Sequence, residues 1–410
     1  MVRGRRSFSC GRAVSGLISC NGAAFGIGIR LRHEQGSNRG RTKMSFLINR
    51  RHFMQATSSV IAVGALSSAT GRARAASTGE LKVNMSGGNW GDAVMKAYVK
   101  PFEEETGIKV TPVLADFTST QVAMMVNTKN VSTDIVNMGQ THVHPLSAKG
   151  YLEAIDYAGW QKDDLEAIAD FAKQPNGFAS YVYSFNMVWN TKKFPAGKSR
   201  PTSWAEFWDV EKFRGVRSLF TGEYGTGPWE EALLADGVPM DKLYPLDIDR
   251  VFASLDKIKP HIRKWWTGGS EILQIMRDNV ADVVQSYDGR ALSLIDEGGP
   301  IEINRNQAKL TTDFWCIPKG SPNAQNAQKF LEITGRADRQ AAFAELIAQA
   351  PTNKNAYKTI PDNVARKLAS HPDYAGTSFA LDAKWYADAG PDGKPNKDRL
   401  VERWNEWILQ

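Results

Sequence analysis

The chain has 410 residues, of which 42% are hydrophobic and 23% charged, and its formal net charge at pH 7 is +7. The first 75 residues hold 13 Lys and Arg but a single Glu, which leaves 38 basic and 43 acidic residues for the remainder. The remainder therefore carries a net charge of −5, and without a cluster of Lys and Arg it gives no indication of nucleic-acid binding.

The segment 44–75 has the pattern of a bacterial export signal. Two adjacent arginines, Arg50 and Arg51, precede an apolar run over 56–69, and a small-residue cleavage pattern ends at Ala75. The run is shorter than the roughly 18 residues that a membrane-spanning helix needs. The twin arginine predicts export by the Tat pathway, cleavage near Ala75 and a protein that works in the periplasm.

The residues before this signal are unusual in place and composition. Met44 stands where a start residue is expected, and residues 1–43 are rich in Arg, Gly and Ser without an apolar period. We interpret 1–43 as a misannotated or disordered leader. Cys10 and Cys20 lie in this leader, so Cys316 is the one cysteine of the remaining chain and cannot form an internal disulfide. We expect Cys316 to be a buried small hydrophobe.

Strands and helices alternate through the rest of the chain. In chain order, periodicity predicts a strand at 81–85, helix 93–105, strand 108–113, helix 121–128, strands 134–138, 180–189 and 215–221, helix 271–277, strand 280–285, and helices 325–334 and 336–348. Gly107 has the position of a helix C-cap. Thr202 or Ser203, with Glu206, has the pattern of a capping box. This alternation predicts a mostly parallel α/β sheet, and about 335 residues suffice for two lobes.

No motif for nucleophilic, phosphate-transfer or metal-dependent catalysis is present. His142 and His144 have the one metal-like spacing: on a strand they would face the same way and could share a metal, yet no third ligand is identifiable. A polar loop is the other interpretation. We therefore predict no enzyme, no cofactor and no metal site.

Aromatic and acidic residues gather where predicted strands end. They are Trp90, Tyr183, Glu223, Tyr224, Trp265, Trp266, Tyr287, Asp288 and Asp313. Ligands of open α/β sheets bind beyond the carboxyl ends of the strands. Aromatic faces and carboxylates together suit an organic cation, because the ring quadrupole attracts an ammonium and the carboxylate pairs with it. Core packing is the alternative for each ring.

Three segments resemble the extracellular solute-binding proteins of ABC importers, in the spermidine/putrescine-binding group. They are 81–110, with Phe102-Glu103-Glu104-Glu105-Thr106-Gly107-Ile108-Lys109-Val110, then 202–215, which begins Thr202-Ser203-Trp204, and 287–318, which begins Tyr287-Asp288-Gly289-Arg290. The resemblance covers roughly residues 80 to 355. It implies a two-lobed α/β fold of the periplasmic-binding-protein type II class, hinged by two crossover strands that close on ligand.

The resemblance also implies lobe limits and hinge positions. The crossovers are expected near 183–185 and 286–289. Lobe 1 is expected at 80–183 plus 290–348, and lobe 2 at 184–289 plus 349–410.

Ligand-binding roles follow from the same resemblance. Trp90 resembles the family's cleft tryptophan, Glu223 and Tyr224 fall near its ammonium-binding acid, and Gln140 lies in the loop after the third strand. Trp265 or Trp266 would supply a second ring, with Asp288 and Asp313 adding negative charge. Arg290 departs from a pure polyamine site, since an arginine in the cleft would suit a carboxylate. Arg290 on the surface, paired with Asp288, is equally compatible with the sequence.

The leading hypothesis is a periplasmic protein that delivers a small amine, such as putrescine or spermidine, to an inner-membrane ABC permease, and acts as a monomer. A zwitterion such as 4-aminobutyrate is the alternative ligand for the same fold. Ferric ion or an anion is a further alternative. A Tat-exported periplasmic metalloenzyme is a third class of hypothesis, which needs clustered ligands that we do not find.

Overall fold

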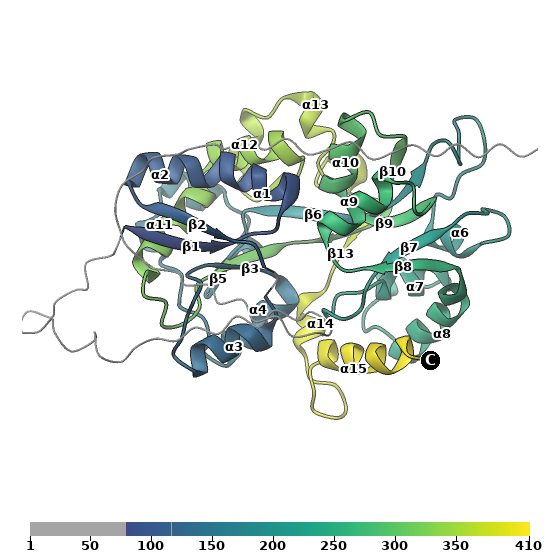
Figure 1. Ribbon diagram of the computed structural model, residues 1–410, viewed down its shortest axis with the longest axis horizontal. Helices are drawn as coiled ribbons and strands as arrows, with labels where there is room; N and C mark the ends of the chain where they lie inside the picture. The colour runs from purple at the N-terminus through teal and green to yellow at the C-terminus, as the bar shows by residue number, and fades with distance from the viewer. Residues whose placement is uncertain (1–78, 116) are drawn as a thin grey trace, which may run out of the picture. The chain divides into compact units, whose positions relative to one another are not determined.

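The computed structural model of the protein describes residues 79–410 apart from residue 116 (Figure 1). The predicted leader at 1–43 and the predicted signal at 44–75 lie outside the described residues. Within the described range, no helix combines the length and the apolar character needed to cross a bilayer.

Two small sheets form the core of what we call lobe 1. Their strands are β1 (Glu80–Asn84), β2 (Lys109–Val113), β3 (Val136–Gly139), β4 (Lys173–Gln174), β5 (Gly177–Phe178) and β11 (Asp313–Cys316). Strands β1 and β2 are parallel, and the other four have the order β3-β11-β5-β4. An isolated bridge between Val83 and Ile135 links the two sheets.

Helices cover both sides of the lobe 1 strands. They are α1 (Gly88–Val94), a π-helical turn (Met95–Val99), α2 (Lys100–Thr106), α3 (Ser119–Asn127), α4 (Gln140–Ala148), α5 (Lys162–Ala167), α11 (Ala324–Gly335) and α12 (Ala337–Ile347). Val94, Tyr98 and Phe102 recur at four-residue spacing and are fully buried. Gly107 ends α2 with φ +70°, a left-handed conformation that glycine adopts without strain.

One larger mixed sheet forms the core of what we call lobe 2. Its strands are β6 (Tyr181–Asn190), β7 (Arg217–Phe220), β8 (Ile262–Trp266), β9 (Val283–Tyr287), β10 (Ile301–Thr311), β12 (Ala350–Pro351) and β13 (Ser378–Ala380). The order is β13-β10-β6-β9-β7-β8, and β12 pairs with the start of β6. Strand β6 runs antiparallel to both of its neighbours, β9 and β10.

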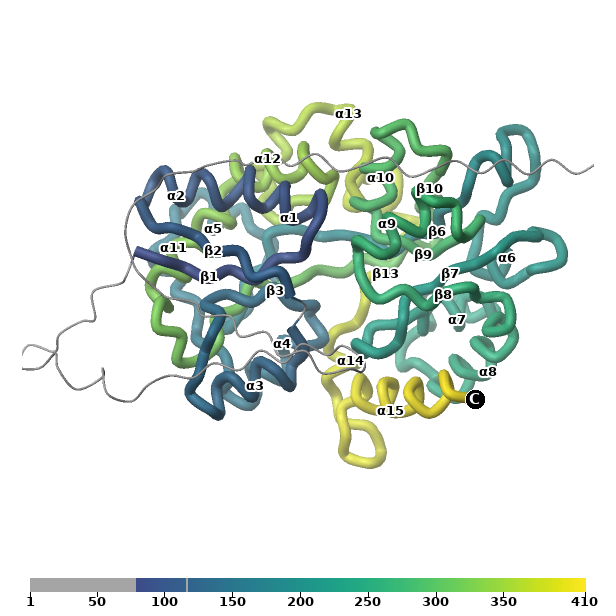
Figure 2. Tube along the Cα trace, viewed as in Figure 1, coloured from purple at the N-terminus to yellow at the C-terminus, as the bar shows by residue number. Residues whose placement is uncertain are grey.

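The helices of lobe 2 include the end of the chain. They are α6 (Trp204–Trp208), α7 (Trp229–Ala235), α8 (Ile248–Ile258), α9 (Gly269–Arg277), α10 (Asp288–Asp296), α14 (Ala383–Ala387) and α15 (Asn396–Ile408). Trp404 and Trp407 of α15 pack into the same apolar cluster as Trp229. Helix α13 (Asp362–Ala365) joins a smaller cluster with α10 and α12. Figure 2 shows the C-terminal segment in yellow, with α14 alongside α4 of lobe 1.

The chain passes between the lobes at a few short segments. Residues 179–183 lead from β5 into β6, and Thr312 separates β10 from β11. Our sequence-based limits put 290–348 in lobe 1 and a crossover at 286–289. Strand pairing instead holds β9 and β10 in one sheet, which favours a crossover near Thr312. The lobe limits stay a prediction, and we propose to draw this one at Thr312.

Most predicted elements are present, and the α/β class is confirmed. Ser203 is the N-cap of α6, since its side chain accepts a hydrogen bond from the Glu206 amide. The prediction of a mostly parallel sheet is wrong, because the strands that connect the lobes run against their neighbours. The histidine pair lies on a helix, α4, and not on a strand.

Candidate functional site

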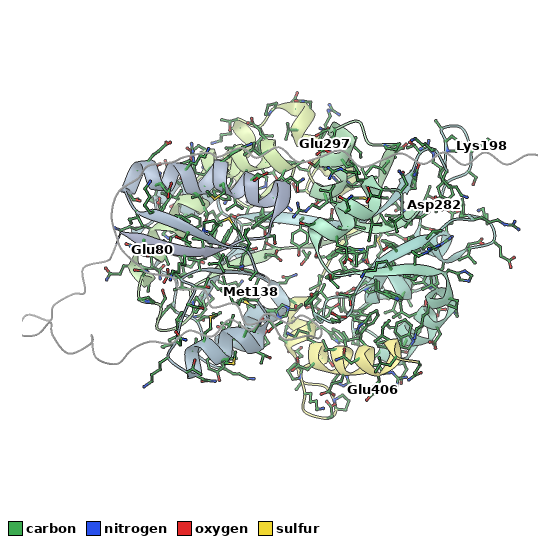
Figure 3. The ribbon with its side chains drawn as sticks, viewed as in Figure 1. Glu80, Met138, Lys198, Asp282, Glu297 and Glu406 are labelled. Atoms are coloured by element: carbon green, nitrogen blue, oxygen red, sulfur yellow. The ribbon has the colours of Figure 1, made fainter. Side chains whose placement is uncertain are left out.

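A cavity of about 370 Å³ lies between the two lobes and is lined from both. Its walls come from the residues that follow β1, β3, β7, β8 and β9, together with the crossover segments. The carboxyl ends of strands thus meet at this cavity, as expected for α/β proteins. Met138, labelled in Figure 3, belongs to the lobe 1 wall.

Seven of the eleven residues proposed from the sequence line this cavity. They are Trp90, Gln140, Tyr183, Tyr224, Tyr287, Arg290 and Asp313. The other four, Glu223, Trp265, Trp266 and Asp288, are not among its lining residues.

Two acids line the cavity: Glu271, which pairs with Lys264 at 3.0 Å, and Asp313, the first residue of β11. Its Oδ1 accepts a hydrogen bond from the Tyr183 hydroxyl at 2.9 Å, and its Oδ2 accepts one from Tyr181 at 3.2 Å. Burial and the charge of Asp313 hold the pKa of both phenols well above their usual range, so both remain donors. The carboxylate is therefore held in a fixed orientation at the crossover.

The arginine that lines the cavity is Arg290, in the first turn of α10. Its guanidinium reaches from lobe 2 to lobe 1, where it donates to the Gly87 carbonyl at 3.1 Å and to the side chain of Asn89. Two glycines make room for it: a Cβ at Gly269 would lie 2.7 Å from Arg290 Nε, and one at Gly88 would lie 3.2 Å from Nη1. Arg290 is thus a cavity residue and not a surface one.

Helix N-termini add positive potential to the walls. Helix α9 begins at the cavity with Gly269 and Ser270, and α4 begins there with Gln140 and Thr141. The N-terminal end of a helix carries a partial positive charge and unsatisfied amide groups. Near Arg290, this arrangement favours a negatively charged ligand group.

Aromatic rings close the other side of the cavity. Tyr287 lies with its ring centre 4.8 Å from Phe185 and 5.5 Å from Tyr183, and Phe220 stacks on Tyr224 at 6.1 Å. Tyr183 connects these rings to Asp313, because its ring contacts Tyr287 and its hydroxyl donates to the carboxylate. Rings and a carboxylate together can hold an ammonium group. Phe185 and Phe220 were not among our sequence candidates, although Phe220 ends β7; Phe185 lies in the middle of β6.

Trp90 is mostly buried and contributes an edge to the cavity. Its indole N–H donates to Gln349 Oε1 at 3.1 Å, and its ring packs against Tyr181 and Trp315. By packing on Tyr181, Trp90 supports one of the two phenols that donate to Asp313. Gln349 also lines the cavity and was missed, because nothing in its local sequence sets it apart.

Asp288 has a structural role that the sequence did not indicate. It is fully buried and accepts hydrogen bonds from the Ser184 amide at 3.1 Å and hydroxyl at 2.8 Å, with Arg305 at 3.3 Å. Burial raises its pKa, while Arg305 and these donors oppose the rise. Asp288 therefore links α10 to β6 and is not among the residues that line the cavity.

The other three candidates that do not line the cavity lie on the surface or within the core. Glu223 is exposed. Trp265 packs on Trp404, with ring centres 5.0 Å apart, and so holds β8 to α15. Trp266 is fully buried behind the aromatic wall, 4.5 Å from Phe220.

The two histidines of α4 point to different surroundings. His142 lines the cavity, whereas His144 is exposed. Residues two apart on a helix do not face the same way. Among the described residues, no cluster of three or more His, Cys, Asp or Glu could hold a metal ion.

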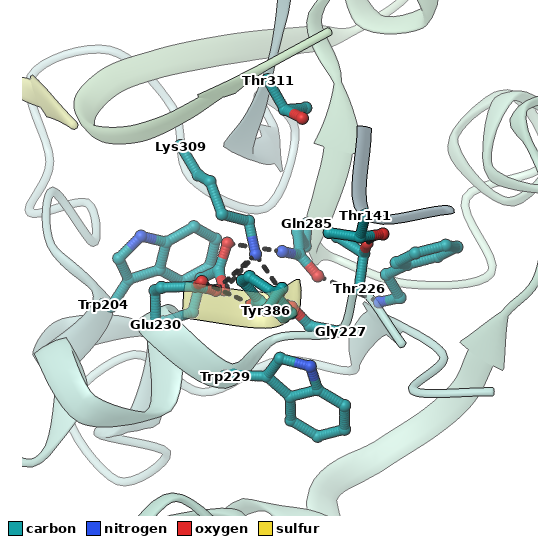
Figure 4. Close-up of polar contacts among 12 residues, drawn as sticks. Thr141, Trp204, Thr226, Gly227, Trp229, Glu230, Gln285, Lys309, Thr311 and Tyr386 are labelled. Atoms are coloured by element: carbon teal, nitrogen blue, oxygen red, sulfur yellow. Dashed lines mark hydrogen bonds and ion pairs between the residues drawn. The ribbon is translucent and has the colours of Figure 1, made fainter. Parts of the chain in front are cut away.

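A buried ion cluster supports the lobe 2 wall from behind (Figure 4). The Lys309 ammonium contacts Glu230 at 2.9 Å and Glu231 at 3.0 Å, and donates to the Gly227 carbonyl at 2.8 Å. All three charged side chains are fully buried. Thr226, next to Gly227, lines the cavity, so Lys309 holds the loop after β7 in place.

Known proteins with similar sequences and structures indicate the family of this chain. Residues 97–371 match the family of bacterial extracellular solute-binding proteins. The gamma-aminobutyric acid-binding protein of Pseudomonas aeruginosa PAO1 is 31% identical over 337 residues, which cover 80% of this chain and 91% of that protein. Two solved structures are each 30% identical. The Atu4243–GABA receptor has a TM-score of 0.70 and covers 80% of this chain and 97% of its own. AgtB from A. tumefaciens R10, in complex with agropinic acid, has a TM-score of 0.72 with 81% and 99% coverage.

Proposed function

Because the chain belongs to the bacterial extracellular solute-binding protein family, we propose that its cavity holds one small zwitterion. The protein is the substrate-binding protein of an ABC importer and delivers its ligand to a membrane permease. The ligand class that we infer carries an ammonium at one end and a carboxylate at the other, as 4-aminobutyrate does. The chain acts as a binding protein and not as an enzyme.

The observation that carries this proposal is that Arg290 and Asp313 line the same cavity. Asp313, with its two phenol donors and the neighbouring rings, attracts an ammonium. Arg290 is a planar donor that binds a carboxylate through two parallel hydrogen bonds. A ligand with one charge of each sign satisfies both groups.

The relatives support the same choice of ligand. One is named for binding gamma-aminobutyric acid, which is 4-aminobutyrate, and it is 31% identical to this chain. A polyamine is the alternative within the family. A diamine would leave a second ammonium for the end of the cavity where Arg290 lies, and like charges at short range disfavour binding.

Three ligands with the same four-carbon chain test this proposal by calorimetry on residues 76–410. 4-Aminobutyrate has both charged ends, putrescine has only ammonium ends, and butyrate has only the carboxylate. We expect 4-aminobutyrate to bind at least 100-fold more tightly than either of the others. Tight putrescine binding with no response to 4-aminobutyrate would show that the ligand is a polyamine.

We also propose that the chain is exported to the periplasm by the Tat pathway, is cleaved near Ala75 and acts there as a monomer. The twin arginine at Arg50 and Arg51 supports the export route. Replacing both arginines by lysine should leave the protein in the cytoplasm, which fractionation would detect. Unchanged export of that variant would point to another route.

A further inference from the structure

The ring of His142 contacts lobe 2, although His142 belongs to α4 of lobe 1. Its Nδ1 lies 3.2 Å from Lys397 Nζ on α15 and 2.8 Å from the Ser119 hydroxyl. A lysine ammonium can only donate, so Nδ1 is an acceptor and the ring proton is on Nε2. The Tyr224 carbonyl, in the loop after β7, accepts the hydrogen bond of the ring.

Lys397 depends on this contact. Lys397 is 7% exposed, and among the described residues the only hydrogen-bond partner of its ammonium is His142. Its methylene carbons pack on Gly225, where a Cβ would lie 2.4 Å from Lys397 Cγ. Gly225 has φ +82°, a conformation that favours glycine, so the loop is shaped to receive this lysine.

We propose that His142, in its neutral form, and Lys397 form a clasp that holds the lobes together around the ligand. A second contact between the lobes lies beside it: Thr141 and Thr226 have their hydroxyl oxygens 3.3 Å apart, and both line the cavity. His142 is thus a positioning residue for closure. This inference rests on the proposed function, because ligand binding is what draws the lobes together.

A proton on His142 would break the clasp. It would place two cations 3.2 Å apart and would remove the acceptor that the buried Lys397 needs. Burial of the ring, with the charge of Lys397, lowers the pKa of His142 to about 3. When the lobes part and the ring meets water, its pKa returns to about 6.5.

Other ionisable groups lie on the elements around the clasp. They are Asp313 and Cys316 on β11, Lys384 and Tyr386 on α14, Glu223 beside Tyr224, and Lys149 and Asp398 near Lys397. Helix α3 and strand β3 carry none. Lys397 is the one whose charge acts on the pKa of His142.

The sign of the pH effect follows from these two pKa values. The closed form holds His142 neutral, so closure is fully favoured above pH 6.5 and is lost as the pH falls below that value. Between pH 7.5 and pH 5.5 the closing equilibrium, and with it ligand affinity, should fall about tenfold. The ligand's own end groups have ordinary pKa values near 4 and 10 and do not titrate in this interval.

The first test is calorimetry with 4-aminobutyrate at pH 7.5 and pH 5.5 on the wild type, His142→Gln and His144→Gln. Glutamine keeps an acceptor and a donor but does not titrate, so His142→Gln should lose the pH dependence, whatever its affinity at pH 7.5. His144 is exposed on the same helix, and its variant should keep the tenfold change. A pH-independent wild type, or a pH-dependent His142→Gln, overturns the proposal.

The second test needs no ligand, so it separates this proposal from the choice of 4-aminobutyrate. Thr141→Cys with Thr226→Cys places two thiols across the cleft, and their disulfide locks the lobes closed. NMR of the imidazole protons, assigned with His142→Gln in the same background, should show no titration of His142 between pH 8 and 5 in the oxidised protein. After reduction His142 should titrate near pH 6.5. The same midpoint in both forms would rule out the clasp, whatever the ligand.

Discussion

The Tyr183 hydroxyl donates a 2.9 Å hydrogen bond to Oδ1 of Asp313, and the two residues lie on different strands, β6 and β11, at the crossover between the lobes. Tyr181 holds the other carboxylate oxygen. Because both phenols stay protonated, they hold the carboxylate in a fixed orientation at the edge of the cavity. This geometry leads to the first prediction.

Asp313→Asn should weaken 4-aminobutyrate binding by about tenfold to a hundredfold. The amide keeps the size of the side chain but loses the charge that attracts an ammonium, and hydrogen bonds to charged groups contribute about 1.5–3 kcal/mol. Calorimetry measures the change. Asp362→Asn, at an exposed acid that begins α13, serves as the control. Equal affinities for wild type and Asp313→Asn would remove Asp313 from the site.

Arg290→Gln should separate the two candidate ligands. Loss of the guanidinium removes the carboxylate partner, so 4-aminobutyrate affinity should fall by at least a hundredfold. Putrescine carries no carboxylate, so its binding should stay equal or become tighter. Calorimetry with both ligands on one preparation measures this difference. An equal loss for the two ligands would mean that Arg290 acts through the fold and not through the ligand.

Gly269→Ala should weaken 4-aminobutyrate binding about tenfold without weakening the fold. The new Cβ would lie 2.7 Å from Arg290 Nε and would displace the guanidinium, while alanine is the better helix former within α9. Gly268→Ala is the matched control, because a Cβ there meets no atom within 4 Å and its φ of −158° suits any residue. Similar affinities for both variants would show that the room at Gly269 does not position the Arg290 guanidinium for the ligand.

Lys309→Met should lower the free energy of unfolding by about 3–5 kcal/mol, because it leaves Glu230 and Glu231 buried without a cation. Burial already raises the pKa of Glu231, and Lys309 opposes that rise. A carboxyl group whose pKa is raised by folding stabilises the folded state at pH values below the pKa of about 4.3 that it has in the unfolded chain. This stabilisation is lost as the pH rises.

The deficit of Lys309→Met should therefore be larger at pH 8 than at pH 5, which urea unfolding at the two pH values measures. Lys384→Met serves as the control, since Lys384 is exposed and pairs with the nearby Asp388 on the surface. A deficit below about 1 kcal/mol at both pH values would show that water or protonation replaces the lysine without cost.

Local sequence signals predicted the elements well and their pairing poorly. The C-cap at Gly107 and the N-cap at Ser203 depend on backbone groups a few residues away, and both are present. The antiparallel pairing of β6 with β9 and β10 joins segments about a hundred residues apart. No local pattern encodes such a partner, so alternation alone suggested parallel strands.

The candidate site shows the same division. Strand ends indicated the edge of the sheets at which the cavity lies, and Tyr287 and Arg290 line the cavity. Asp288 lies between them in sequence and turns inward, because its partner Arg305 lies on β10. Trp265 likewise faces Trp404 at the end of the chain. A side chain's face is thus set by distant partners that a single sequence does not reveal.

The position of Tyr181, Tyr183 and Asp313 on the crossover segments sets an order of events for capture. Atoms nearest a hinge axis travel least when the lobes part, so this group exists before closure. Arg290 meets Gly87 only when the lobes approach each other. An incoming amino acid should therefore dock by its ammonium in the open protein and engage its carboxylate last.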